Sequence, residues 1–180
     1  MKKPLIKTSK NPRSNCSEIE QTNQLLFKPL GIETTTIVAE IVNENYFAHT
    51  FMLNKFKVAF RSAKITPKKI GQFVALWKRN VTGTSVPYSW SDSHDIYIIA
   101  ARKDSNFGLF IFPKNLLLQN GILSNKFKEG KRGFRVYPIW EETTNKQAIQ
   151  TQIWQTKYFI DLSAENKIDF KKAKELLGLK

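Results

Sequence analysis

The stretch that decides the fold is FRSAKITPKKIGQFVALWKR, residues 60–79. Its basic residues face no acid within the stretch, and no Asp or Glu occurs between Glu44 and Asp92. Pro67 presets φ for a turn and Gly71 lets the chain re-enter a strand, so the stretch reads as strand, turn, strand. Because so much uncompensated positive charge repels itself, we expect this hairpin to face a polyanion or bound counterions.

The segments around this hairpin predict an α+β fold, with a central mixed β-sheet flanked by helices. Residues 56–62 alternate apolar and polar side chains, whereas residues 95–101 and 107–112 are almost continuously apolar, as in buried strands. A further strand is expected at 134–137. The expected helices cover residues 18–28, 114–120, 144–161 and 169–177, the third with Ile149, Ile153 and Ile160 on its packed stripe.

Length and charge limit the class of protein. The 180 residues fit a single domain over 17–180, preceded by a polar, basic arm over 1–16. The net charge of +14 points to nucleic acid, an anionic membrane surface or another acidic partner, unless the basic surface has no function. The only cysteine, Cys16, excludes an intrachain disulfide. The sequence shows no signal peptide and no membrane span, so we expect a cytoplasmic protein without a membrane partner.

Familiar catalytic motifs are missing from the sequence. It contains no P-loop, GxGxxG, GxSxG or HExxH pattern, and its two histidines cannot hold a metal ion by themselves. We therefore expect no cofactor and no metal. Asp95 opens a buried strand, where it serves either as a functional carboxylate or as an acceptor for nearby backbone N–H groups.

Aromatic residues are interleaved with both basic segments, 60–79 and 125–133. Exposed rings would stack on unpaired bases, although most aromatic residues in strands belong to the core. Trp77 and Trp90 are the stacking candidates. The aromatic residues concerned are Phe73, Trp77, Tyr88, Trp90, Phe127, Phe134, Tyr137 and Trp140.

Four motifs resemble the MepB family of bacterial proteins, one of which is encoded beside a multidrug-efflux pump and its repressor. They are the basic stretch from Arg61 to Arg79, FGLFIFPK at 107–114, GKRG at 130–133, and Trp154-Gln155. The resemblance covers residues 46–159. It implies a relationship to the PD-(D/E)xK superfamily, and hence a restriction-endonuclease-like core.

The resemblance assigns the core elements of that superfamily to this chain. Residues 95–101 match the second strand, 107–114 the third strand and 134–137 the last strand. Asp95 then matches the metal-binding Asp and Lys114 the Lys of the (D/E)xK motif. Phe112 stands where the motif has its acid, and a phenyl ring cannot bind Mg²⁺. Asp95 and Lys114 are therefore vestigial candidates only.

The sequence thus predicts a nucleic-acid-binding protein on a catalytically degenerate nuclease-like fold. We expect it to prefer RNA and single-stranded DNA over duplex, with weak sequence specificity and no enzymatic activity. Two alternatives stay open: a divergent nuclease with a metal site at Glu40, Glu44 and Asp95, and a stress-linked sensor of a small ligand or protein. The expected nucleic-acid contacts are Arg61, Lys64, Lys68, Lys69, Trp77, Lys78, Arg79, Lys131, Arg132 and Arg135.

Overall fold

The computed structural model describes residues 17–35, 37–164 and 166–179, so the expected basic arm and Cys16 lie outside the described residues. Its helices are α1 (Ser17–Thr22), η1 (Asn23–Phe27, a π-helical turn), η2 (Glu44–Tyr46, a 3₁₀ turn), α2 (Lys114–Gln119), α3 (Lys146–Thr156) and α4 (Phe170–Leu176). Its strands are β1 (Val38–Ala39), β2 (His49–Leu53), β3 (Phe56–Ser62), β4 (Lys64–Thr66), β5 (Lys69–Ala75), β6 (Trp77–Arg79), β7 (Ser85–Pro87), β8 (Ile96–Lys103), β9 (Asn106–Pro113), β10 (Gly133–Val136) and β11 (Phe159–Asp161). None of these helices is long and apolar enough to cross a membrane.

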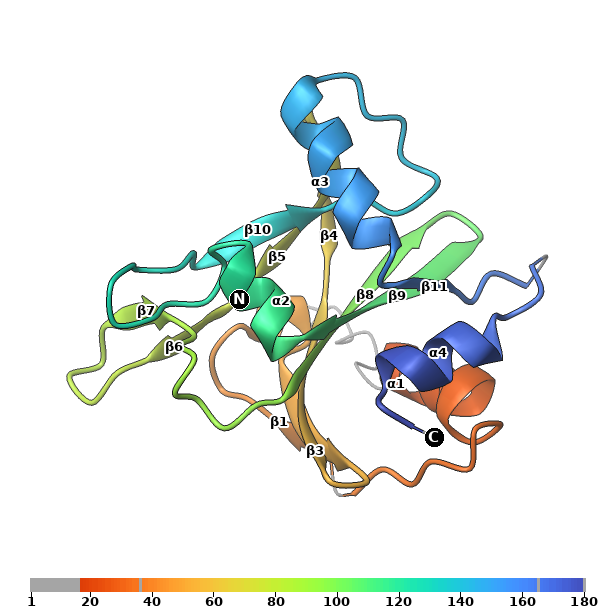
Figure 1. Cartoon of the computed structure of the whole chain (residues 1–180), viewed down its shortest axis with the longest axis horizontal. Helices are drawn as coiled ribbons and strands as arrows, with labels where there is room; N and C mark the ends of the chain where they lie inside the picture. Colours follow the sequence, from red (N-terminus) through yellow and green to blue (C-terminus); the bar gives the residue numbers. More distant parts are fainter. Residues whose placement is uncertain (1–16, 36, 165, 180) are drawn as a thin grey trace, which may run out of the picture.

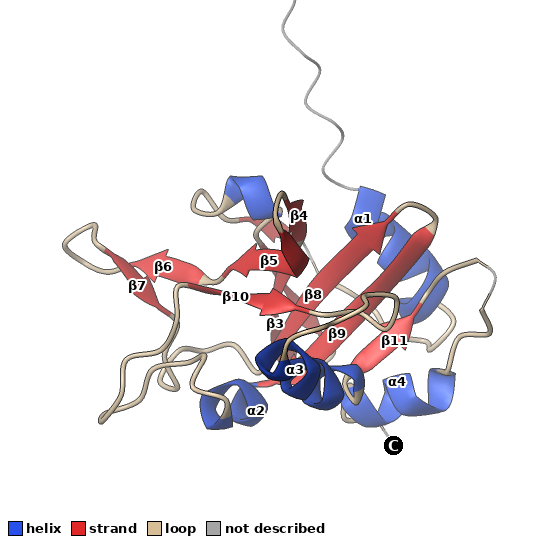
Figure 2. Ribbon diagram, turned by 90° about the horizontal axis from the view of Figure 1, so that it is seen from above, coloured by secondary structure: helices blue, strands red, loops and turns tan. Residues whose placement is uncertain are grey.

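A six-stranded sheet forms the centre of the molecule, with strand order β1-β2-β3-β8-β9-β11. β3 and β8 pair in parallel and the other neighbours pair antiparallel, so the sheet is mixed. Helices lie on both sides of it (Figures 1 and 2). The predicted α+β architecture with a central mixed sheet and flanking helices is confirmed.

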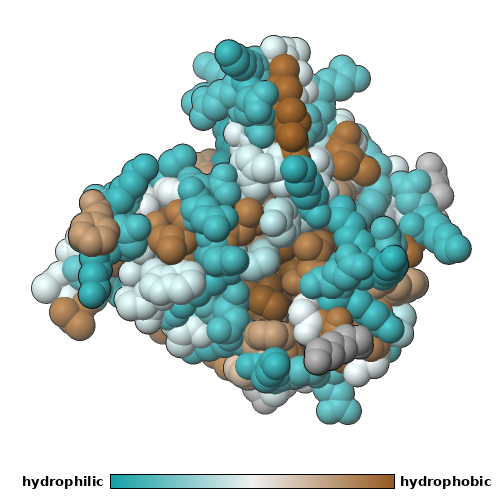
Figure 3. All heavy atoms as spheres, in the orientation of Figure 1, coloured by the Kyte–Doolittle hydropathy of each residue, from teal (hydrophilic) through white to brown (hydrophobic). Residues whose placement is uncertain are grey.

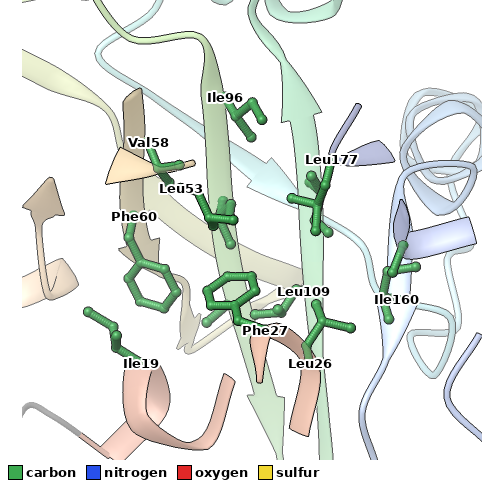
Figure 4. Close-up of a cluster of buried hydrophobic side chains, with 14 of the residues drawn as sticks. Ile19, Leu26, Phe27, Leu53, Val58, Phe60, Ile96, Leu109, Ile160 and Leu177 are labelled. Atoms are coloured by element: carbon green, nitrogen blue, oxygen red, sulfur yellow. The ribbon is translucent and has the colours of Figure 1, made fainter. Parts of the chain in front are cut away.

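Both faces of this sheet are buried, as the apolar run of β8 predicts. Successive side chains of a strand point to opposite faces, so Ile96 and Ile98 belong to one core cluster and Tyr97 and Ile99 to another. The first cluster is covered by α1, η1 and α4, with Leu26, Phe27 and Leu177 packed against the strands, as Figure 4 shows in part. The second cluster is covered by a smaller sheet together with α2 and α3.

The smaller sheet has the strand order β10-β5-β4 and contains the turn of the predicted basic hairpin between β4 and β5. The predicted hairpin over residues 60–79 is wrong in extent, because residues 60–62 belong to β3 of the central sheet and β6 pairs with β7 in a separate two-stranded sheet. Its turn lies at Pro67 and Lys68, and Lys68 takes a left-handed conformation with φ of +73°. Gly71 also has a positive φ, and a Cβ there would lie 2.5 Å from the ring of Tyr137. The turn is therefore confirmed, and Gly71 is required both by its backbone angle and by close packing.

Two further details of the prediction are wrong. The strand at 134–137 does not join the central sheet: β10 pairs with β5, and β11 takes the place beside β9. The third helix is shorter than expected, because Asn145 caps it through Ala148 N–H at 2.8 Å and β11 follows it closely. Its Ile149 and Ile153 are 37% and 51% exposed, since α3 packs through Ala148, Trp154 and Gln155 instead.

Candidate nucleic-acid interface

A pocket of about 670 Å³ lies between the smaller sheet, α2 and α3, and we call it the basic groove. Four cationic side chains from two separate parts of the chain line it, and none of its lining residues is acidic. Amide and aromatic side chains complete the wall. The lining residues are Lys68, Lys69, Ile70, Asn120, Ile122, Lys131, Gly133, Phe134, Arg135, Tyr137, Asn145, Gln147, Thr151, Trp154 and Gln155.

The hairpin turn and β10 bring these cations together. Lys68 and Lys69 sit at the turn between β4 and β5, while Lys131 directly precedes β10. Arg135 on β10 ties the two strands to each other, since its guanidinium donates to the Gly71 carbonyl at 3.0 Å and to Thr66 Oγ1 at 2.6 Å. Arg135 is thus held in a fixed position, whereas both lysines of the turn are exposed.

Other predicted contacts lie outside the groove. Lys64 is exposed, with its ammonium 5.3 Å from the centre of the Tyr46 ring. Lys78 forms an ion pair with Asp92. Arg79 lies over the Trp77 ring at 5.5 Å, and Arg132 pairs with Glu129 at 3.1 Å. These side chains lie on β4, on β6 and in the loop before β10, and each has a partner within the protein.

Arg61 does not belong to the exposed surface, and the expectation of an accessible contact there is wrong. Its side chain has no exposed area. The guanidinium pairs with Glu40 at 2.6 Å and also donates to the Tyr88 hydroxyl at 2.9 Å. β3 belongs to the central sheet and its residue 61 points into the second core cluster, so the side chain needs a buried partner. Sequence spacing alone gave no sign of Glu40, which lies 21 residues earlier.

A buried polar network surrounds this ion pair. Thr50 Oγ1 donates to Glu40 at 2.8 Å and lies 3.3 Å from His94 Nε2. Burial lowers the pKa of His94 from 6.5 to about 4, and burial likewise raises the pKa of Tyr88 to about 12. Both groups are therefore neutral near pH 7, and the network's charges reside on Arg61 and Glu40.

The vestigial pair lies outside the lining of the basic groove, with Asp95 directly before β8 and Lys114 at the start of α2. The Asp95 carboxylate accepts the Lys57 N–H at 2.8 Å, which is the backbone-binding role left open by the sequence. The Lys114 ammonium instead donates to the Asp92 carbonyl and lies 5.1 Å from the centre of the Trp90 ring. Phe112 is fully buried, packed against Phe110, Phe134, Trp154 and Tyr158.

The alternative metal site is not assembled in this structure. Glu40 and Glu44 line a second pocket of about 270 Å³ together with His49, but Asp95 is not part of it. One oxygen of Glu40 is engaged by Arg61 and the other by Thr50. Across the described residues, no three His, Cys, Asp or Glu side chains gather as a metal-binding group.

The two stacking candidates differ in accessibility, and neither lines the groove. Trp90 is 48% exposed, while Trp77 is half-buried in β6. The groove instead presents Tyr137 and Trp154, together with amides such as Asn120 and Gln147, none of which sequence reasoning selected as contacts. The sequence held a signal for Tyr137, because this residue lies close to Lys131 in the chain. It held none for Gln147 and Trp154, because the contribution of α3 to the groove depends on how the helix packs.

Comparison with known proteins decides the family. The MepB-like family matches residues 40–161 of the chain. The chain belongs to the MepB-like family. A solved structure described as the crystal structure of MepB is 37% identical, with a TM-score of 0.71, over 74% of this chain and 89% of that chain. The MepB-like match spans the hairpin, the groove lining and the Arg61 network alike.

A second solved structure is that of a bacterial homing endonuclease. It is 11% identical with a TM-score of 0.45, over 78% of this chain and 87% of that chain, and a likeness this weak carries no argument about function. No curated protein matches the MepB-like sequence.

Proposed function

We propose that the chain binds nucleic acid through the basic groove, with its cations on phosphates. The observation that carries this proposal is a groove of about 670 Å³ that four cationic side chains line and no acid enters. A protein surface of this kind attracts polyanions, and phosphate contacts fix the position of a strand without reading its sequence. Sequence specificity is accordingly weak.

Single strands and RNA are the preferred ligands in this proposal. The longest described helix, α3, forms one wall of the basic groove with its own side chains and carries a single cationic residue, Lys146, so we do not assign it to a major groove. Unpaired bases, in contrast, can reach the aromatic rings and amide groups beside the cations. Recognition of single-stranded segments in other proteins rests on such stacking and on hydrogen bonds to base edges.

We further propose that binding occurs without cleavage. In the family resemblance the acid of the (D/E)xK motif falls at Phe112, whose ring is buried among other aromatic side chains. Asp95 and Lys114 are each engaged by the backbone of neighbouring residues. Hydrolysis of a phosphodiester on a metal ion needs carboxylates that converge on the ion, which supports a binding role over an enzymatic one.

The salt dependence of affinity tests the binding proposal. With four cations on phosphates of a single strand, log affinity should fall against log salt with a slope of about −3. Replacing Lys68 and Lys69 with Ala should make the slope shallower by roughly one to two units. A matched control removes Lys171 and Lys174 of α4, which packs on the opposite face of the central sheet and should leave the slope unchanged.

Anisotropy titrations with RNA, single-stranded DNA and duplex would give these slopes and the order of preference. An affinity that does not respond to salt, or an equal response of both double variants, would refute the groove as the binding site. Incubation of labelled RNA and DNA with Mg²⁺ or Mn²⁺ tests the second part. Cleavage that EDTA abolishes and Asp95→Ala eliminates would establish a divergent nuclease instead.

A further inference from the structure

One aromatic side chain stands apart from the core and from the groove. Phe127 lies in the loop between α2 and β10, and 95% of its surface is exposed. Moving a phenyl ring out of water is favourable, so an exposed ring offers free energy of binding to a ligand that covers it. Its chain neighbours Lys126 and Lys128 are exposed as well.

The loop that carries Phe127 is held by specific hydrogen bonds. The side-chain oxygen of Asn125 accepts the N–H of Phe127 at 2.9 Å and the N–H of Lys128 at 2.8 Å, and the Asn125 N–H donates to the Lys128 carbonyl at 2.9 Å. These bonds form a closed turn at the tip of the loop. Phe127 is therefore presented by an ordered turn, with little conformational entropy left to lose when a ligand binds its ring.

The base of the loop is fixed just as closely. The Gly130 N–H donates to Ser124 Oγ at 2.9 Å, and the Lys131 N–H donates to the Ile122 carbonyl at 2.9 Å. A Cβ at position 130 would lie 2.3 Å from that carbonyl oxygen, so only glycine permits this approach. Lys131 and Ile122 both line the basic groove, and the loop is thus a continuation of the groove wall.

The charge around the ring is positive. The single acid of the loop, Glu129, is paired with Arg132 at 3.1 Å. Arg132 also donates from Nε to the Ser85 carbonyl at 2.9 Å, which joins the loop to the β6–β7 hairpin. Loop and hairpin project from the same side of the molecule (Figure 1), and this edge is largely hydrophilic with small isolated apolar patches (Figure 3).

We propose that Phe127 is a base-stacking residue: its ring receives an unpaired base of an RNA or DNA strand whose phosphates lie along Lys126, Lys128 and Lys131. Every base has a π-face, so this contact is tolerant of sequence. Bases inside a duplex are already stacked and offer no free face to the ring. The contact thus gives a physical reason for a preference for single strands, and it rests on the proposed function of the groove.

The test compares a short uridine oligomer with an abasic oligomer of the same length, which keeps the phosphates and lacks the bases. Phe127→Ala should weaken binding of the uridine oligomer about 5- to 150-fold and leave the abasic oligomer unaffected. Phe127→Tyr should restore binding, because a phenol ring stacks as well. Ile41→Ala is the matched control: Ile41 is 90% exposed and lines the other pocket, and its loss should change neither affinity.

The outcomes separate this inference from the proposed function. If Phe127→Ala binds both oligomers like the wild type while the Lys68 and Lys69 double variant is weakened, stacking by Phe127 is refuted and the groove stands. If the wild-type protein binds neither oligomer, both proposals are refuted. If Phe127→Ala loses binding to phosphatidylserine vesicles and binds both oligomers like the wild type, the ring belongs to a membrane-binding surface and the inference is overturned.

Discussion

Arg61 and Lys68 stand seven positions apart in one basic stretch, yet they occupy opposite environments. Arg61 is buried in the central sheet and paired with Glu40, whereas Lys68 is exposed at the turn of the smaller sheet, in a groove without acids. A buried cation must be paired and hydrogen-bonded to be tolerated, while an exposed one remains available for an external anion. The same residue class therefore stabilises the fold at one position and is free to bind a ligand at the other.

The largest expected difference between the two regions is in stability. Arg61→Ala should lower the free energy of unfolding by about 3–5 kcal/mol, because it leaves the Glu40 carboxylate partly buried without its cation. Lys64→Ala, an exposed change in the same stretch, should stay within about 0.5 kcal/mol. Denaturant titrations of both variants measure the contrast. Equal midpoints would mean that the buried pair does not stabilise the protein.

The second difference is in pH dependence, and it concerns His94. Since the pKa of His94 is about 4 in the folded protein against 6.5 ordinarily, the unfolded chain binds the proton more readily. The associated stability is complete above pH 6.5 and is lost as the pH falls toward 4, by roughly 3 kcal/mol in total. Unfolding midpoints at pH 7 and pH 5 would show this loss in the wild type.

His94→Gln should remove that part of the pH dependence, and His49→Gln should retain it. Parallel pH profiles for the wild type and His94→Gln would contradict the assignment to His94. The basic groove contains no side chain whose charge changes in this pH range, because no histidine or acid lines it.

The third and smallest expected difference is that a change at Lys68 raises stability and lowers affinity. Lys68 has a φ of +73°, which is strained for any residue except glycine. Lys68→Gly should relieve this strain and raise the free energy of unfolding by about 0.5 kcal/mol, after the greater entropy of glycine in the unfolded chain is deducted. The same change removes a cation from the groove and should weaken oligonucleotide binding.

Thermal or chemical unfolding and an anisotropy titration on one preparation would measure both effects. Lys69→Gly is the control, because Lys69 begins β5 and has no positive φ. This variant should lose stability, since glycine destabilises a strand, and it should lose affinity, since a cation is removed from the groove. A loss of stability in Lys68→Gly as large as in Lys69→Gly would show that the turn is not strained.

Local patterns predicted most of the elements. Alternation in β3 and the apolar runs of β8 and β9 placed these strands within one or two residues, because burial on one or both faces imposes the side-chain pattern directly. The spacing of apolar residues predicted the wrong packed face for α3, because Ile149 and Ile153 are exposed and Gln155 is buried. Gln155 satisfies the Tyr137 N–H and the Arg135 carbonyl, which is a tertiary requirement that no helical periodicity reveals.

By itself, the sequence determined the α+β class, a basic turn at Pro67, and the excess of positive charge. These features depend on residue type and short-range spacing. Only the tertiary structure decided that Arg61 is buried, that β10 pairs with β5, and that Lys131 and Arg135 meet Lys68 and Lys69 in one groove. Strand pairing brings together residues more than 60 positions apart, and the face on which a side chain lies is set by the sheet that its strand joins.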